Sequence, residues 1–459
     1  MPLILSARRS VLLAALVTSL MGCAAPTPPP TPTFTPIVFV HGNGDSAALW
    51  TTTVWRFESN GWPRERLFAI DLPLPSARDD DTVVQAGRSS SADAARFLAA
   101  EVDAMLMRTG ARQVALVGNS RGANTIRNYV QNFGGAAKVS HVVLGGGVNH
   151  GVYADPARNP GSEFNGAGPF MQGLNAPKGA NGNEVTPGPR WMTIRSDNND
   201  KFAQPDGVWL GRPGTPTFVT FDAPALKGAE NIVLPRRDHR EVSYHPEAFA
   251  HTYRFIAGVP AMRLDVSAET QAILDGRISG MGPGGANNLP LPNARVEVYA
   301  VNAQTGERIG PPRHERNVAA DGRWGPFQAD PVAHHEFVLS APGYATLHIY
   351  RSPFPRSSNT VHLRAERLSD ADKAAAASIG FTRPRAYFGL PRDRIVFDGI
   401  TPAPGVPSGV AGVAVSRVRL KESGRAVVAE FESENIRERL VGRAWPTADN
   451  HLVVLELHY

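Results

Sequence analysis

Residues 114–124 read VALVGNSRGAN, which places a serine between two glycines directly after an apolar run. The run at 114–117 is typical of a buried strand, and residues 125–133 predict a helix. A strand, a tight turn and a helix in this order force Ser120 into a strained conformation and expose its side chain at the edge of a sheet. The pattern favours a nucleophile over a plain small turn.

A serine hydroxyl is a weak nucleophile and needs a base, and in a strand–turn–helix site of this kind an acid and then a histidine follow along the chain. The strand predicted at 191–195 leads into SDNND, which contains Asp197 and Asp200. Asp200 is the preferred acid because the loop has left the strand at that point. Asp197 remains the alternative, and a solvated turn is the structural interpretation of either residue.

A histidine follows the next predicted strand, residues 231–234, in the sequence PRRDH. We therefore predict that His239 is the base. His245 and His251 are weaker candidates because they fall in or beside the helix predicted for HPEAFAHTYRFI. Ser120, Asp200 and His239 then follow three predicted strands in the order that a catalytic triad of this kind requires.

Two backbone amides are needed to stabilise the oxyanion that forms when a serine attacks a carbonyl group. One belongs to Arg121, the residue after the candidate nucleophile. The other is predicted at Asn43, because the sequence FVHGNGD places His41 and Gly42 at the end of an early strand. A plain strand–helix turn is the alternative interpretation of this loop.

The remaining pattern of the first half alternates strands with helices. Further strands are predicted at 37–42, 67–73 and 141–144, and a helix at 91–108. This alternation predicts a parallel sheet with helices on both faces. Residues 152–189 form a long segment rich in Gly, Pro and Asn. The segment has two possible interpretations, a lid or binding loop and an ill-packed surface excursion.

The N-terminal residues are typical of an export signal. Residues 1–22 contain Arg8 and Arg9 before a short apolar run, and Cys23 follows as the only cysteine of the chain. This pattern indicates a lipoprotein leader with acylated Cys23, and an ordinary cleaved leader is the alternative. Residues 23–36 form a Pro-rich tether. We expect an exported cell-envelope lipoprotein at the outer membrane or periplasmic face, or a secreted protein without lipidation.

After residue 261 the helical periodicity fades, and short alternating segments separated by turn residues predict an antiparallel β domain of sandwich or barrel type. The predicted boundaries are 37–260 for the α/β domain and 261–459 for the β domain. A helical patch at 369–377 leaves open whether the second domain is one module or two, with the break near 366–380.

The sequences VHGNG, VGNSRG, GGGVNHG (145–151), SDNND and the His239 loop together resemble the microbial lipases and esterases of the α/β-hydrolase fold. The resemblance covers about residues 35–258. A hydrolase followed by a β domain is similar to secreted lipases with a C-terminal lipid-binding module. The resemblance implies ester hydrolysis through an acyl-enzyme, in which Ser120 attacks, His239 transfers the proton and Asp200 orients His239.

The sequence departs from the family pattern at Asn43 and Arg121, where apolar or small residues are frequent, so we expect a more polar pocket mouth. A lipid, a small ester or a polyester is the expected substrate class. A polyester depolymerase and a binding lipoprotein without catalysis are the alternatives.

Other partners and cofactors have little support in the sequence. The formal charge of +5 falls to +3 when Arg8 and Arg9 are removed, and no Lys/Arg block favours nucleic acid. Triad chemistry requires no cofactor. The glycines at 280–285 precede no helix and predict a turn rather than a dinucleotide site. His334, His335 and Glu336 are adjacent on a predicted strand and face alternate sides, which argues against a shared metal ion. The oligomeric state is open.

Overall fold

Six parallel strands form one sheet in the first half of the computed structural model, which describes residues 34–434 and 436–459. Their spatial order is β2-β1-β3-β4-β5-β6. The bounds are β1 Ile37–Val40, β2 Leu67–Ala69, β3 Val114–Asn119, β4 Val139–Gly145, β5 Arg190–Ser196 and β6 Glu230–Leu234. All six predicted strands are present. The predicted leader, Cys23 and most of the tether lie outside the described residues.

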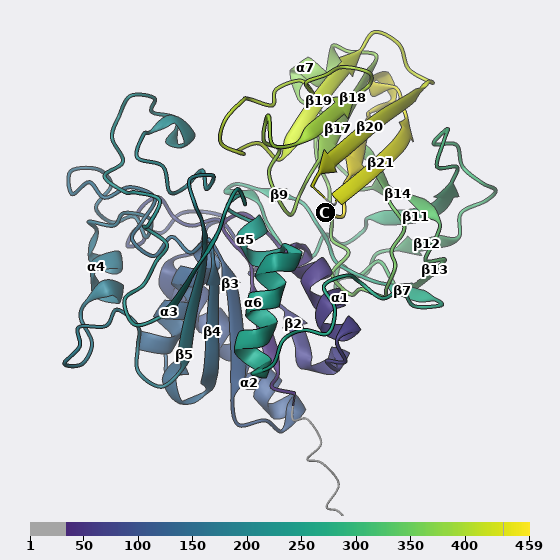
Figure 1. Cartoon of the computed structure of the whole chain (residues 1–459). Helices are drawn as coiled ribbons and strands as arrows, with labels where there is room; N and C mark the ends of the chain where they lie inside the picture. Colours follow the sequence, from purple (N-terminus) through teal and green to yellow (C-terminus); the bar gives the residue numbers. More distant parts are fainter. Residues whose placement is uncertain (1–33, 435) are drawn as a thin grey trace, which may run out of the picture. The chain divides into compact units, whose positions relative to one another are not determined.

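Helices cover both faces of this sheet because successive residues of a strand point to opposite sides. Val38 and Val40 pack with the apolar sides of α2 (Ser91–Thr109) and α3 (Arg121–Asn132). Ile37 and Phe39 pack with α1 (Thr51–Ser59) and α6 (Pro246–Ala257) on the other face. Figure 1 shows α3 and α6 on opposite sides of the strands. The parallel sheet and its two helical layers confirm the predicted α/β-hydrolase fold.

Two helices differ from the sequence prediction. Helix α3 begins at Arg121 rather than at residue 125, because the turn at Ser120 leads directly into the first helical residue. Helix α1 was not predicted, since three consecutive threonines give its first turn a low intrinsic helix propensity. Burial of Trp55 and Phe57 on its inner side stabilises it instead.

The second half of the chain is β-rich. A seven-stranded sheet has the order β12-β11-β14-β15-β22-β17-β19, and a three-stranded sheet has the order β18-β20-β21. The bounds are β11 Arg295–Val301, β12 His314–Asn317, β14 His334–Ser340, β15 Thr346–Arg351, β17 Ala377–Thr382, β18 Arg394–Phe397, β19 Val415–Leu420, β20 Ala426–Ser433, β21 Ile436–Arg443 and β22 His451–Glu456. Short pairs complete it: β7 Ala272–Leu274 with β13 Phe327–Ala329, β8 Ile278–Ser279 with β16 Leu363–Arg364, and β9 Met281–Gly282 with β10 Gly285–Ala286.

The C-terminal region is β-rich, as predicted, and most of its strand pairs are antiparallel. The antiparallel prediction does not hold throughout, because β22 pairs in parallel with both β15 and β17, and β16 pairs in parallel with β8. Strand β22 therefore lies inside the large sheet, between β15, which precedes residues 366–380, and β17, which begins within that range at Ala377. The predicted helical patch at 369–377 is reduced to α7 (Asp370–Lys373), which Ser369 caps. The glycine-rich residues 280–285 form the β9–β10 hairpin, as the turn prediction required.

The segment at 152–189 is mostly irregular and contains the short helix α4 (Pro169–Asn175). A second long excursion, which the sequence did not single out, separates β5 from β6 and contains only a short 3-10 turn, Val208–Leu210. None of the helices in the described parts of the chain is long and apolar enough to cross a membrane.

Candidate active site

Ser120 lies at the turn between β3 and α3, with φ 54° and ψ −122°. This left-handed conformation is costly for a residue with a Cβ and persists only where the surrounding structure imposes it. The flanking glycines make the turn possible: a Cβ on Gly122 would lie 2.4 Å from the carbonyl oxygen of Val40, and one on Gly118 would lie 3.0 Å from the Gly122 carbonyl carbon. The turn therefore has the geometry expected of a nucleophile elbow.

His239 and Asp200 form a buried pair on neighbouring loops. The Nδ1 atom of His239 lies 2.9 Å from Asp200 Oδ2, and the other carboxylate oxygen accepts a hydrogen bond of 2.8 Å from the Phe202 amide. The Phe202 ring packs edge-on against the imidazole, with 4.7 Å between centroids. Because a carboxylate only accepts hydrogen bonds, this contact places the proton on Nδ1 and leaves Nε2 as the basic nitrogen.

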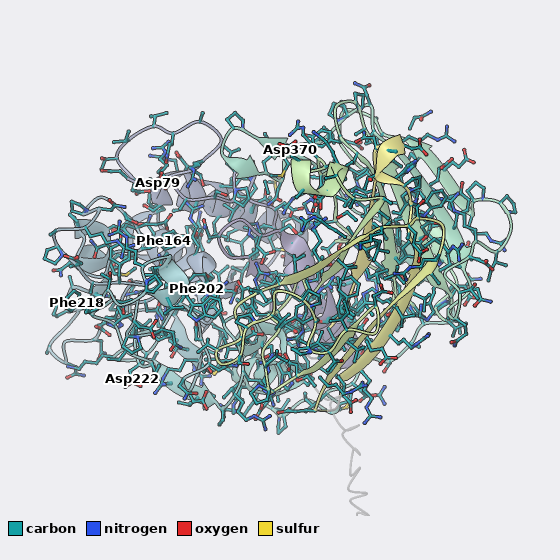
Figure 2. The ribbon with its side chains drawn as sticks, turned by 90° about the horizontal axis from the view of Figure 1, so that it is seen from above. Asp79, Phe164, Phe202, Phe218, Asp222 and Asp370 are labelled. Atoms are coloured by element: carbon teal, nitrogen blue, oxygen red, sulfur yellow. The ribbon has the colours of Figure 1, made fainter. Side chains whose placement is uncertain are left out.

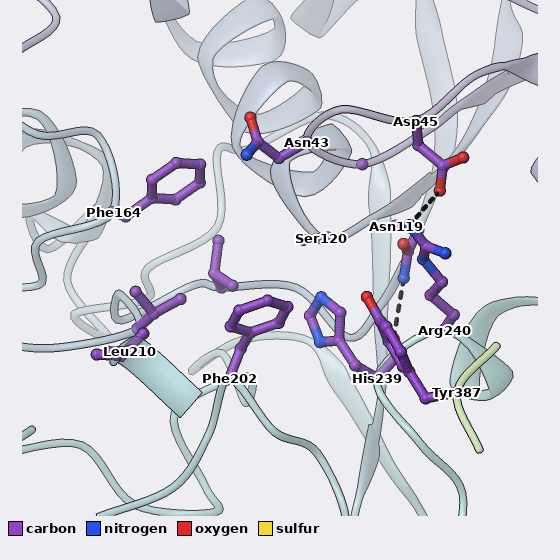
Figure 3. A pocket seen from close by; sticks show the side chains of 13 residues that line it. Asn43, Asp45, Asn119, Ser120, Phe164, Phe202, Leu210, His239, Arg240 and Tyr387 are labelled. Atoms are coloured by element: carbon purple, nitrogen blue, oxygen red, sulfur yellow. Dashed lines mark hydrogen bonds and ion pairs between the residues drawn. The ribbon is translucent and has the colours of Figure 1, made fainter. Parts of the chain in front are cut away.

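The Nε2 atom of His239 is buried and has no hydrogen-bond partner among the described residues. His239 and Ser120 line the same pocket, together with Asn43 and Asn119, and Figure 3 shows these residues around one cavity. The structure therefore brings the three predicted triad residues to one site: Asp200 binds His239, and His239 and Ser120 line one pocket.

The alternative acid, Asp197, holds its own loop instead. Its Oδ1 atom accepts hydrogen bonds from the amides of Asn198 and Arg236 and from the Ser196 hydroxyl. Although burial opposes the shift, the hydrogen bonds from Asn198 and Arg236 lower the pKa of Asp197. The carboxylate that pairs with His239 is that of Asp200, not that of Asp197.

The two other candidate histidines lie on or next to α6. His245 precedes that helix, and its Nδ1 accepts a hydrogen bond from the Glu247 amide. Burial lowers the pKa of His245 to about 4, so its imidazole is neutral at neutral pH. His251 is a residue of α6 itself. Neither lines the Ser120 pocket.

The two predicted oxyanion amides lie next to Ser120. Arg121 is the first residue of α3, so its N–H has no acceptor within the helix. A Cβ on Gly42 would lie 3.0 Å from the Cβ of Ser120, which brings the Gly42–Asn43 backbone against the serine. The Asn43 side chain accepts a hydrogen bond of 2.8 Å from the Ala77 amide, which holds this loop in place.

The expectation that Arg121 makes the pocket mouth polar was wrong. Its guanidinium is buried, lies 2.6 Å from Glu163, and donates to the carbonyl oxygens of Pro75 and Ser89. The Arg121 side chain is held by these partners and does not line the Ser120 pocket. Arg121 thus joins the elbow to two surrounding loops.

Asn119 is a site residue that the sequence analysis missed. Its buried side-chain amide donates to the carbonyl oxygens of Gly145 and His239 and to the Ser243 hydroxyl. Asn119 therefore connects the strand before the nucleophile to the loop that carries the imidazole. Its position next to Ser120 was the available signal, but the pattern does not indicate which way the amide points.

The glycine run after β4 has a related role. A Cβ on Gly146, which has φ +57°, would lie 2.4 Å from the His239 carbonyl oxygen, and one on Gly145 would overlap the Ser243 hydroxyl. The motif GGGVNHG thus permits the close approach of the His239 loop to the end of the sheet.

The pocket has a volume of about 240 Å³ and two chemically different sides. The apolar side consists of Val148, Val152, Phe164, Phe202 and Leu210, and the polar side contains Asp45, Asn119 and Arg240. Both long excursions contribute, because Val152 and Phe164 belong to residues 152–189, and Phe202 and Leu210 follow β5. Figure 2 shows Phe164 and Phe202 near one another and Phe218 farther out.

The polar side also contains residues from far along the chain. Arg240 makes an ion pair of 3.1 Å with Asp45, and Tyr387, from the β-rich half, lines the pocket beside His239. Lys201 lies behind Tyr387, and burial together with the Arg240 charge lowers the pKa of Lys201 to about 8. No three His, Cys, Asp or Glu side chains gather to hold a metal ion in the part of the chain that the structure describes.

Two family models match the chain in turn. Residues 37–252 match the model described as the alpha/beta hydrolase family, and residues 270–368 match the lipase C-terminal domain. The first half of the chain thus has the α/β-hydrolase fold by both its sheet and its sequence. The second match ends at residue 368.

Three solved structures illustrate the similarity. The mature form of Bacillus licheniformis lipase BlEst2 is 22% identical over 47% of this chain and 89% of that chain, with a TM-score of 0.33. Its propeptide form is 14% identical over 91% and 94%, with a TM-score of 0.37. Legionella pneumophila phospholipase PlaB is 13% identical over 92% and 93%, with a TM-score of 0.32. At such TM-scores these likenesses carry no functional inference.

Proposed function

We propose that the protein is a serine carboxylic-ester hydrolase. Ser120 Oγ attacks the ester carbonyl carbon while His239 Nε2 takes the hydroxyl proton, and His239 returns that proton to the departing alcohol. Water, activated by the same imidazole, then hydrolyses the acyl-enzyme. The observation that supports this most strongly is the His239–Asp200 hydrogen bond in the pocket that Ser120 lines, with Nε2 of His239 unpartnered by any described residue.

Charge on the substrate oxygen develops in the transition state, and the amides of Arg121 and Asn43 are the proposed donors to it. Both belong to backbone next to Ser120, and one is at the positive end of α3. Backbone donors of this kind need no reorganisation when the oxyanion forms.

The proposed acyl group is short. The pocket volume of about 240 Å³ is smaller than the range of about 300–1,000 Å³ that is common for ligand pockets. The apolar residues that line the pocket can therefore contact only a short acyl chain inside it. The lipoprotein leader predicted at Cys23 adds the proposal that the enzyme works at the cell envelope, on esters that reach a membrane surface.

The experiment compares the wild type with Ser120→Ala on nitrophenyl esters of increasing acyl length, on emulsified long-chain fat and on polyester film. We expect the wild type to hydrolyse short-chain esters fastest, and the variant to fold normally and lose roughly 10³-fold or more of kcat. A fluorophosphonate probe, which labels activated serines, is expected to label only the wild type.

Absence of labelling and hydrolysis in the wild type would overturn the proposal and favour a non-catalytic binding lipoprotein. If the wild type hydrolyses polyester film faster than any soluble ester, the serine mechanism would stand and the proposed short-chain substrate would be replaced by a polymer.

A further inference from the structure

Residues 383–392, which follow β17 in the β-rich half, lie against the loop that carries His239. The amide of Tyr387 donates a hydrogen bond of 2.9 Å to Asp238, the residue directly before the imidazole. Arg240, the residue directly after it, donates to the Pro384 carbonyl oxygen at 2.7 Å. The 383–392 segment therefore contacts the His239 loop on both sides of the histidine.

Two arginines of this segment with buried guanidinium groups pair with Asp238 of the His239 loop and with Glu241, the first residue of α5 (Glu241–Tyr244), and Arg392 also binds the buried Asp393. Arg383 and Arg392 bind the two oxygens of Glu241 at 2.7 and 2.6 Å, and both lie within 3.8 Å of Asp238. Burial together with the Glu241 charge raises the pKa of Asp238 to about 6. Removing one member of such a buried group leaves an uncompensated charge beside the histidine. The cost of that buried charge favours a displacement of the His239 loop.

The loop that carries Asp200 is held from the same half of the chain. The Asn199 side chain accepts a hydrogen bond of 3.0 Å from the Ala411 amide, and Lys201 donates to the Gly412 carbonyl oxygen at 2.8 Å. Both neighbours of the proposed triad acid are thus bound to residues 411–412.

Tyr387 extends these contacts into the pocket. Two cations lie over its ring, with the Lys201 ammonium 3.9 Å and the Arg240 guanidinium 5.0 Å from the ring centroid. Figure 3 shows the ring beside His239 with its hydroxyl end directed into the cavity. These two contacts and the hydrogen bond of its own amide restrict the orientation of the ring, which forms part of the pocket wall.

We propose that the β-rich half is a working part of the active site: Arg383 and Arg392 are positioning residues for the His239 loop, and Tyr387 determines which substrates fit the pocket. The inference rests on the proposed ester hydrolysis and assigns the C-terminal residues a role in the chemistry itself. Hydrolysis of a soluble ester in the absence of any lipid or polymer surface then depends on these residues, which a purely substrate-anchoring domain would not require.

The first test measures kcat and KM of full-length Arg392→Gln and Arg392→Lys on a soluble short-chain ester. Misplacement of the base is expected to lower kcat of Arg392→Gln roughly 10- to 100-fold with KM nearly unchanged. Arg392→Lys keeps the charge and is expected to recover part of the loss. Arg425→Gln is the matched control, because Arg425 makes a bidentate pair with Asp398 in the same half of the chain and does not line the pocket.

The second test changes the pocket wall without removing a buried charge. Tyr387→Ala is expected to raise KM for the small ester about tenfold and to improve the relative rate on bulkier esters, since the ring no longer limits the space. Tyr387→Phe keeps the ring and is expected to remain within about threefold of the wild type. Circular dichroism and thermal melting of each variant establish that it is folded at the assay temperature.

Unchanged kcat in folded Arg392→Gln and unchanged KM and ester preference in Tyr387→Ala, with an active wild type, would overturn this inference and leave the proposed function standing. If Arg392→Gln does not fold, the inference is tested by kcat of Arg392→Lys and by KM and ester preference of Tyr387→Ala. A wild type that neither labels nor hydrolyses esters would overturn the proposed function, and the inference with it.

Discussion

Ser120 and His239 show how single residues acquire reactivity from their surroundings. The backbone strain at Ser120 is imposed by β1 and α3, which approach so closely that Gly122 has no room for a Cβ. The His239 imidazole is oriented by the hydrogen bond between Nδ1 and Asp200 and by the Phe202 ring that packs against it. Its Nε2 atom has no partner among the described residues. Both side chains therefore have few alternative positions, which favours a preorganised site.

The two aspartates of SDNND are distinguished by what they bind, which leads to a residue-scale prediction. Asp200→Asn is expected to lower kcat by roughly 10²- to 10⁴-fold, because an amide at this position no longer fixes the correct imidazole tautomer. Asp197→Asn keeps an oxygen that can accept the same backbone hydrogen bonds, so a loss below about tenfold is expected. Steady-state kinetics on a soluble ester measure both variants; an Asp197→Asn loss as large as that of Asp200→Asn would contradict the assignment.

Sequence patterns predicted the residues of this site better than the directions of their side chains. Ser120, Asp200 and His239 were proposed as a triad from their places after three strands, and the structure places Asp200 against His239 and His239 in the pocket that Ser120 lines. The side chain of Arg121 and the role of Asn119 were not predicted, because both depend on loops 30 or more residues distant, such as those of Glu163 and His239. A pattern of neighbours in sequence contains no information on such contacts.

At the scale of elements, the junction between β1, β3 and α3 depends on close backbone contact. The carbonyl oxygens of Val40 and His41 would lie 2.4 and 2.9 Å from a Cβ on Gly122, and backbone atoms cannot withdraw as a flexible side chain does. The glycines of the elbow thus determine how near the helix start lies to the strand that precedes Asn43.

This close packing predicts that Gly122→Ala lowers the free energy of unfolding by about 1–3 kcal/mol, even though alanine is the better helix former. Gly173→Ala is the matched control in α4, where nothing lies within 4 Å of the added Cβ, and a change between zero and a gain of about 1 kcal/mol is expected. Chemical denaturation followed by circular dichroism measures both. Equal stability of the two variants would show that α3 can shift without cost.

The elements of the first half were largely predictable because each buried strand and amphipathic helix contains its own periodicity. The pairing of the C-terminal strands was not. Strand β22 lies between β15 and β17, about 100 and 70 residues earlier in the chain, and its pairing is parallel to both. The alternating pattern of such a strand predicts that it has two faces but does not identify its neighbours.

At the scale of the whole molecule, the two halves share buried side chains. Trp55 from α1 belongs to the hydrophobic core of the β-rich half, where its indole N–H donates to the Ser357 carbonyl oxygen at 2.9 Å. Its ring packs edge-on against Phe354 with 6.2 Å between centroids. The boundary predicted near residue 260 therefore does not separate the cores completely, because Trp55 precedes it and packs in a core whose other buried members follow it.

We expect the full-length chain to unfold in one cooperative transition, and Trp55→Ala to lower its free energy of unfolding by about 3–5 kcal/mol while the transition remains single. Urea titration followed by both tryptophan fluorescence and far-ultraviolet circular dichroism measures this. Met262→Ala, at a side chain that is 82% exposed, is the control and is expected to have little effect. Two separate transitions in the wild type would contradict the shared core.

The amino-acid sequence by itself determined the α/β-hydrolase fold, the elbow and the order of its proposed catalytic partners, because strand periodicity, turn glycines and chain order are local properties. Only the tertiary structure decided which aspartate meets His239, where the Arg121 side chain lies, and that residues 383–392 reach the pocket. These are contacts between segments far apart in the chain, and their energy comes from burying charges and rings together, which no single segment specifies.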